Sequence, residues 1–197
     1  DCESLPVKDV LSGNGKDTAP PSIVGLAGSN SNDIFYIFGF HAIYRVSRTF
    51  GDRYRAESWN FARIAGGDAL GDFNGNGSVA RFERPYSGYW DVDANALIFV
   101  DTNNNKIKRA THIGGDPDLA TNWEITTVAG STAGFADGTS PQFSLPTDVK
   151  PAANGGYYVL DYNNNRIRLV SASGTASTVA GTGIVGQTDG TPGVLDN

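Results

Sequence analysis

The residues best spaced to do chemistry lie in one short loop. Oxygen-bearing side chains recur at alternate positions and again at the end of the loop, where they are Asp72, Asn74, Asn76, Ser78 and Glu83. This spacing, with a glycine at the sharp turn, fits the calcium-loop pattern D-x-[DN]-x-[DN]-G-x5-E. Hard cations are bound by such convergent oxygens, so the loop is a candidate Ca²⁺ site.

A structural interpretation of the same loop is also open. A Gly/Asp loop recurs in each repeat described below, and Ser144 takes the place of Glu83 in the next one. No helical pattern flanks the loop, so we expect a weak site on a β scaffold and no EF-hand. The tripeptide beginning at Asn76 is also an N-glycosylation sequon, and a glycan there would compete with calcium.

Residue types needed for catalysis are poorly placed. His41 and His112 lie in different units, with no histidine partner at metal-binding spacing. No serine lies in a nucleophile elbow. The acids Asp91 and Asp93 are expected to flank a strand end. The sequence therefore predicts a protein that is not an enzyme.

The elements that must position these side chains form a repeat. The sequence DYNNNRIRLV at positions 161–170 has a near copy, DTNNNKIKRA, at positions 101–110. The apolar run before each acid predicts a buried strand, and the basic/apolar alternation after it predicts a strand with one exposed face. Asn and Asp tolerate left-handed backbone, so the asparagines predict a hairpin connection.

Further elements recur around each hairpin. A Phe-x-x-Pro element occurs at 82–85 and at 143–146, and Val-Ala-Gly occurs at 128–130 and at 179–181. A weaker relative, Ile-Ala-Gly, ends at Gly66. Each unit thus contains four short strands, which is typical of a propeller blade.

On these residues the chain resembles the NHL-repeat β-propeller family. The matching positions are Asp101, Asn104, Lys106, Ile107 and Lys108 in one unit, and Asp161, Asn164, Arg166, Ile167 and Arg168 in the next. The resemblance implies a propeller fold and says little about function, since the family includes binding modules and a few enzymes.

We therefore expect an all-β fold of four-stranded antiparallel NHL-like blades, a partial or assembly-completed propeller. The expected parts are an N-terminal segment with a closing strand (1–21), a degenerate blade 1 (22–63), blade 2 (64–127), blade 3 (128–180) and the start of a further blade (181–197). The expected strands span 22–26, 34–38, 42–46, 61–64, 88–92, 96–100, 106–111, 123–128, 147–150, 157–160, 166–171 and 176–180. Three blades make an arc, whereas propellers have about four to eight. We expect the chain to be a piece of a longer protein, or to be completed by a second copy or another subunit.

A long loop expected at 47–60 is the candidate interaction surface. It contains Arg53, Tyr54, Arg55 and Trp59, and Arg, Tyr and Trp are enriched at interface hot spots. The alternative is that the two aromatic side chains pack over the edge of the blade.

Composition narrows the choice of partners. The 197 residues carry a net charge of −6, which argues against nucleic acid as a partner. The basic side chains near the two asparagine turns are interpreted as solvated strand faces: Lys106, Lys108, Arg109, Arg166 and Arg168. No run of apolar residues is long enough for a membrane span. The single cysteine, Cys2, excludes a disulfide within the chain, and we expect a free thiol near the terminus.

The sequence as a whole favours a non-catalytic interaction or structural module. We expect it to be extracellular or at a cell surface, from the Asp1 start, the acidic Asn- and Gly-rich composition and the sequon. Its partners would be proteins, or further copies in an oligomer or fibre. The alternative is a fragment of a propeller enzyme, a lyase or hydrolase, whose metal and catalytic residues lie outside this chain. The amidating lyases are similar in fold class and use histidines and a metal in the central channel, so a histidine cluster elsewhere would favour the enzyme.

Overall fold

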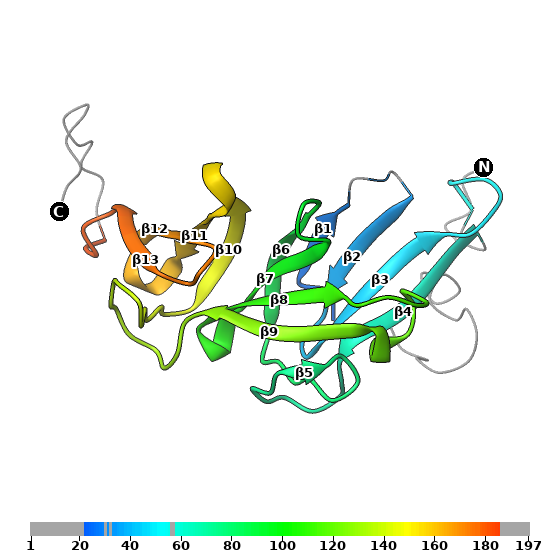
Figure 1. Cartoon of the computed structure of the whole chain (residues 1–197), viewed down its shortest axis with the longest axis horizontal. Helices are drawn as coiled ribbons and strands as arrows, with labels where there is room; N and C mark the ends of the chain where they lie inside the picture. The colour runs from blue at the N-terminus through cyan, green and yellow to red at the C-terminus, as the bar shows by residue number, and fades with distance from the viewer. Residues whose placement is uncertain (1–21, 30, 32, 56–57, 186–197) are drawn as a thin grey trace.

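The computed structural model describes residues 22–29, 31, 33–55 and 58–185. Within these residues all regular structure is β-strand, apart from 3-10 turns of three residues each. The strands form three antiparallel sheets (Figure 1), so the all-β prediction is confirmed. No described helix is long and apolar enough to cross a membrane. The strand expected within 1–21, Cys2 and most of the segment 181–197 lie outside the described residues.

Each sheet is built mainly as a meander, in which strands pair with their neighbours in the chain. Sheet 1 consists of β1 (Gly25–Gly28), β2 (Ile34–Phe38), β3 (Ala42–Arg48) and β4 (Trp59–Gly66). Sheet 2 consists of β6 (Pro85–Asp91), β7 (Ala96–Asp101), β8 (Lys106–His112) and β9 (Trp123–Ala129), with the short β5 (Gly75–Asn76) beside β9. Sheet 3 consists of β10 (Pro146–Pro151), β11 (Tyr157–Asp161), β12 (Arg166–Val170) and β13 (Ala176–Ala180). The sequence predicted each of these strands within a few residues, except β5.

The asparagine turns connect their strands as predicted. A 3-10 turn, Thr102–Asn104, joins β7 to β8, and Tyr162–Asn164 joins β11 to β12. Each turn ends at an asparagine in the left-handed conformation, Asn105 (φ 57°) or Asn165 (φ 51°). Asparagine is the non-glycine residue that tolerates this backbone best, which explains the repeated NNN triplet.

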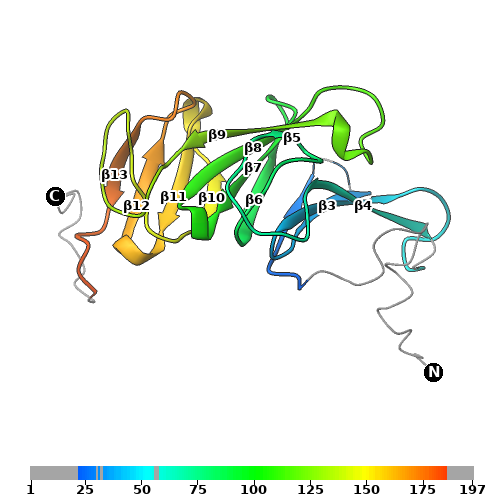
Figure 2. The same cartoon turned by 90° about the horizontal axis from the view of Figure 1, so that it is seen from below.

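The three sheets pack face to face in chain order, as Figures 1 and 2 show. The first strand of each four-stranded meander lies beside the first strand of the next, β1 by β6 and β6 by β10. We call the contact of sheets 1 and 2 the first junction, and that of sheets 2 and 3 the second junction. Because side chains alternate along a strand, Leu97 and Phe99 enter the core of the first junction, while Ile98 and Val100 enter the core of the second.

The glycine that closes the Ala-Gly motif is required by close backbone approach. Gly66, Gly130 and Gly181 have φ of 83°, 97° and 93°. A Cβ on any of them would lie 2.2–2.3 Å from a carbonyl oxygen of the hairpin turn in the same sheet, such as that of Asn105 for Gly130. Only glycine combines this backbone with that contact.

The basic side chains of the repeat build buried ionic clusters. Lys108 is fully buried, and its Nζ lies 2.9 Å from Asp72 and 3.4 Å from Asp101. At the same position in sheet 3, Arg168 lies 2.6 Å from Asp137 and 2.7 Å from Asp161, again with no exposed side-chain surface. The interpretation of these two cations as solvated strand faces is therefore wrong. The alternation of basic and apolar residues shows which side chains share a face of the strand. It does not show that the neighbouring Gly/Asp loop covers Lys108 and Arg168 on that face.

The middle asparagine of each NNN triplet, Asn104 or Asn164, completes the cluster. Asn104 Nδ2 donates to Asp101 and to the carbonyl of Gly71, both at 2.8 Å. Asn164 does the same with Asp161, at 2.9 Å, and with Gly134, at 2.7 Å. The acid, asparagine and basic residue of the repeat thus tie the hairpin to the Gly/Asp loop, a structural role.

In the cluster of sheet 2, burial outweighs the favourable contacts of the buried acid. Burial raises the pKa of Asp101 to about 6, against hydrogen bonds from Asn104 and attraction from Lys108. Lys108 also pairs with Asp72. Burial would raise the pKa of Asp72, but Lys106 and Lys108 together hold this pKa below its ordinary value. The described residues of sheet 1 form no such cluster, because Tyr44 occupies the position of Lys108 and stacks on Phe61, ring centroids 4.7 Å apart.

Candidate functional site

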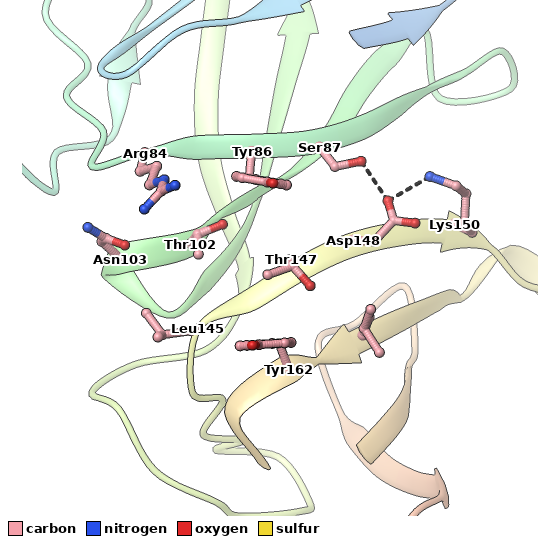
Figure 3. A pocket seen from close by; sticks show the side chains of 11 residues that line it. Arg84, Tyr86, Ser87, Thr102, Asn103, Leu145, Thr147, Asp148, Lys150 and Tyr162 are labelled. Atoms are coloured by element: carbon pink, nitrogen blue, oxygen red, sulfur yellow. Dashed lines mark hydrogen bonds and ion pairs between the residues drawn. The ribbon is translucent and has the colours of Figure 1, made fainter. Parts of the chain in front are cut away.

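An open cleft of about 680 Å³ lies where the first strands of sheets 2 and 3 meet, at the second junction. Its walls come from β6, β10 and β11 and from the two asparagine turns. The lining residues are Arg84, Tyr86, Ser87, Thr102, Asn103, Leu145, Thr147, Asp148, Lys150, Leu160 and Tyr162 (Figure 3). Its volume lies within the range of small-molecule sites.

The rim of the cleft is formed by two residues in strained backbone. Arg84 (φ 59°) and Leu145 (φ 48°) both precede the proline that begins the first strand of their sheet. Bulky residues rarely adopt this left-handed conformation, and it persists only where the surroundings impose it. Here the N–H of Arg84 donates to the Phe40 carbonyl, 2.8 Å, and that of Leu145 to Asn105 Oδ1, 2.9 Å.

The residue before Arg84 and the residue before Leu145 each donate a backbone hydrogen bond to the buried acid of their repeat. The N–H of Glu83 donates to Asp101 Oδ1 at 2.9 Å, and that of Ser144 donates to Asp161 Oδ1 at 2.8 Å. The ionic clusters therefore position the cleft rim, although they lie outside the cleft.

A polar bridge crosses the floor of the cleft. Asp148 on β10 accepts a hydrogen bond from Ser87 on β6 and another from Lys150, both at 2.6 Å (Figure 3). Thr102 Oγ1 donates to the Pro146 carbonyl at 2.8 Å. These bonds hold the two walls at a fixed separation, so the cleft is preformed.

Arg84 is the cation of the cleft without an acidic partner. Its guanidinium carbon lies 5.7 Å from the ring centroid of Tyr86 and 5.9 Å from that of Phe40. Within the described ranges no carboxylate lies at ion-pair distance from it, whereas Lys150 is neutralised by Asp148. The cleft therefore offers one unneutralised positive charge beside an aromatic ring.

The predicted calcium ligands lie elsewhere and are held by other partners. Asp72 accepts hydrogen bonds from Lys106 and Lys108, and Asn74 Oδ1 accepts one from Lys108 at 3.2 Å. A calcium ion would have to displace both ammonium groups from Asp72. The described residues contain no group of three or more His, Cys, Asp or Glu suited to a metal, and calcium binding at this loop stays a prediction.

The remaining loop residues are also engaged. Asn76 Oδ1 accepts from the N–H and hydroxyl of Ser78, and its Nδ2 donates to the Thr121 carbonyl at 2.6 Å. Glu83 accepts from Asn103 at 3.2 Å, beside the cleft and away from Asp72. A glycan on Asn76 would replace the bond to Thr121.

The predicted interaction loop is shorter than expected. β3 runs to Arg48 and β4 begins at Trp59, which pairs with Arg48, so the placement of Trp59 in the loop is wrong. Trp59 packs edge-on against Phe35, ring centroids 5.5 Å apart, and its Nε1 donates to the Arg53 carbonyl. Arg53 and Arg55 are exposed. Tyr54 is 88% exposed.

Sequence reasoning missed the cleft because its walls come from two repeats. The Phe-x-x-Pro element marked Arg84 and Leu145 as neighbours of a strand start, and nothing more. A signal was available in the two bulky residues that stand before proline at the same place in successive repeats.

No protein-family model and no curated protein matches the sequence. Among solved structures, the fold is similar to auxiliary nutrient binding proteins from Bacteroides ovatus (TM-score 0.56, 23% identity) and Bacteroides thetaiotaomicron (0.58, 20%). It is also similar to a Bacteroides thetaiotaomicron protein of unknown function (0.62, 19%). These matches cover 75%, 78% and 88% of this chain but only 35%, 36% and 39% of those chains. The chain thus spans well under half the length of these structures, and the likeness concerns the fold alone.

Proposed function

We propose that the chain is a non-catalytic binding module whose three sheets are consecutive blades of an NHL-like β-propeller. Two features support this architecture. Each sheet contains a four-stranded meander, and the first strands of successive sheets lie side by side, as they do around a propeller axis. The repeat glycine recurs in all three sheets, and the ionic cluster recurs at the same place in sheets 2 and 3.

The observation that carries the proposal is the outer face of sheet 3. Tyr158, Leu160 and Ile167 are 43%, 44% and 42% exposed there. Their counterparts sixty positions earlier are Ile98, Val100 and Ile107, all fully buried beneath sheet 3. Within the described part of the chain, the same apolar face is thus covered in sheet 2 and exposed in sheet 3.

The occupant that fits this face is a further sheet of the same repeat. Sheet 3 and the loop before β10 cover sheet 2 with a phenylalanine, a tyrosine and valines, namely Phe143, Tyr157, Val149 and Val159. An incoming sheet with that composition would bury the exposed face of sheet 3, and apolar burial drives such association. In a solution of this chain alone, a second copy supplies the sheet.

The binding role rests on the cleft and on the likeness to the nutrient binding proteins. The cleft lies beside the first strands, where a completed ring would place its central channel. A module that captures nutrients acts where they arrive, so we propose an extracellular or cell-surface location. Protein partners would use the exposed loop residues Arg53, Tyr54 and Arg55.

Light scattering of the purified chain tests the assembly. We expect a particle of at least twice the chain mass of 20.8 kDa, and Ile167→Glu should reduce it to a single chain. Val92→Glu, at an exposed apolar residue of the β6–β7 turn, is the matched control and should leave the mass unchanged. A single wild-type chain that unfolds cooperatively would show that three sheets suffice, and would overturn the proposal.

A further inference from the structure

The cleft at the second junction has a definite chemical character. Its charged lining groups among the described residues are Arg84, Lys150 and Asp148, and the last two neutralise each other at 2.6 Å. Counted over the described residues, the site therefore keeps one net positive charge on a protein of net charge −6. Glu83, which precedes Arg84 in the chain, is outside the lining and accepts a hydrogen bond from Asn103.

The position of Arg84 suits a ligand anion. Its guanidinium presents N–H donors in a planar fork that matches a carboxylate, and no protein carboxylate takes that place in the described chain. Figure 3 shows the side chain extending from the start of β6 toward the space near Thr102. The strained backbone at Arg84 aims it there, and its N–H bond to Phe40 holds that conformation.

Two tyrosines give the cleft apolar surfaces that also carry hydroxyl groups. Figure 3 shows Tyr86 and Tyr162 on opposite walls, both rings seen nearly edge-on. Aromatic faces pack against the C–H faces of sugar rings, and phenol groups bond to ligand hydroxyls. Leu145 extends the apolar surface, and Thr147 adds a hydroxyl.

We propose that the cleft binds a small hydroxylated carboxylate of the uronic acid type, with Arg84 on the carboxylate and Tyr86 and Tyr162 on the sugar ring. This inference rests on the proposed binding role and names its ligand class. The alternative anions fit less well. A phosphate or sulfate would use Arg84 but not the two rings, and a neutral sugar would use the rings but not the charge.

Isothermal titration calorimetry with D-galacturonate and D-galactose tests the assignment, because the two sugars differ only in having a carboxylate or a hydroxymethyl group. We expect galacturonate to bind at least about tenfold more tightly, since a charged hydrogen bond contributes that much. The preference should shrink at high salt. A titration with inorganic phosphate distinguishes a simple anion site from a monosaccharide site. A titration with polygalacturonate distinguishes a polymer site from a monosaccharide site.

Two variants assign the roles. Arg84→Gln removes the positive charge but keeps a polar side chain, and it should weaken galacturonate about tenfold or more while leaving galactose unchanged. Tyr162→Ala, at an exposed ring, should weaken both sugars. Arg63→Gln, on sheet 1 and paired with the exposed Asp68, is the matched control and should change neither.

Three results would overturn the inference: equal affinity for the two sugars, an unaltered affinity in Arg84→Gln, or no binding of either sugar. Thermal unfolding of each variant checks that it is folded. Failure here is distinguishable from failure of the proposed function, because the assembly is measured by light scattering without ligand.

Discussion

Replacing Arg168 by methionine should reveal how much the buried ionic cluster of sheet 3 stabilises the fold. The guanidinium donates to Asp161 at 2.7 Å, to Asp137 at 2.6 Å, and to the carbonyls of Ala136 and Gln142 at 2.6 and 3.1 Å. Methionine fills part of the volume but leaves the Asp161 carboxylate fully buried without its cation. Breaking a buried pair from one side costs about 3–5 kcal/mol, a large share of the roughly 5–15 kcal/mol that stabilises a domain.

Urea unfolding followed by tryptophan fluorescence measures the decrease in the free energy of unfolding. Lys150→Met is the matched control, because its ion pair with Asp148 is exposed, 56% and 37% for the two side chains, and such pairs contribute about 0–1 kcal/mol. Adding Asp161→Asn to Arg168→Met should recover much of the loss, since no buried charge then remains. A loss in Arg168→Met no larger than in the Lys150 control would refute the assignment of the repeat signature to a structural cluster.

Two further predictions concern the glycine of the Ala-Gly motif and the ionic cluster of sheet 2. Gly130→Ala should lose about 3 kcal/mol or more in urea unfolding, because the methyl group would meet the Asn105 carbonyl. Gly138→Ala, with similar φ but open space around it, should lose only about 1–2 kcal/mol; equal losses would contradict the role of the contact. The Asp101 carboxyl should titrate with a pKa of about 6 in carboxyl-carbon NMR of the folded protein. Since this exceeds its ordinary value of 3.8, the folded state binds the proton first, so this group's contribution to stability rises as pH falls from 6 toward 4 and is lost as pH rises through 6. A midpoint near 4 would show that Lys108 neutralises Asp101 fully.

Of the two candidate sites, the sequence predicted the loop at Asp72 and did not predict the cleft at Arg84. The loop at Asp72 was found by spacing alone, and spacing could not show that lysines already hold its carboxylate. Lys106 and Lys108 reach it from a hairpin more than thirty positions away in the chain. The Arg84 cleft had no motif to mark it, because it exists only where two repeats meet.

The sequence by itself determined the local structure. Alternating apolar residues, the Asp-x-Asn-Asn-Asn turns and the Ala-Gly endings specify strands, hairpins and their repetition, because these features depend on backbone preferences of a few neighbouring residues. Only the tertiary structure decided which faces are covered. Ile107 and Ile167 occupy the same repeat position, yet one is buried and the other is 42% exposed. Burial depends on the neighbouring sheet, and so do the charge states and clefts that follow from it.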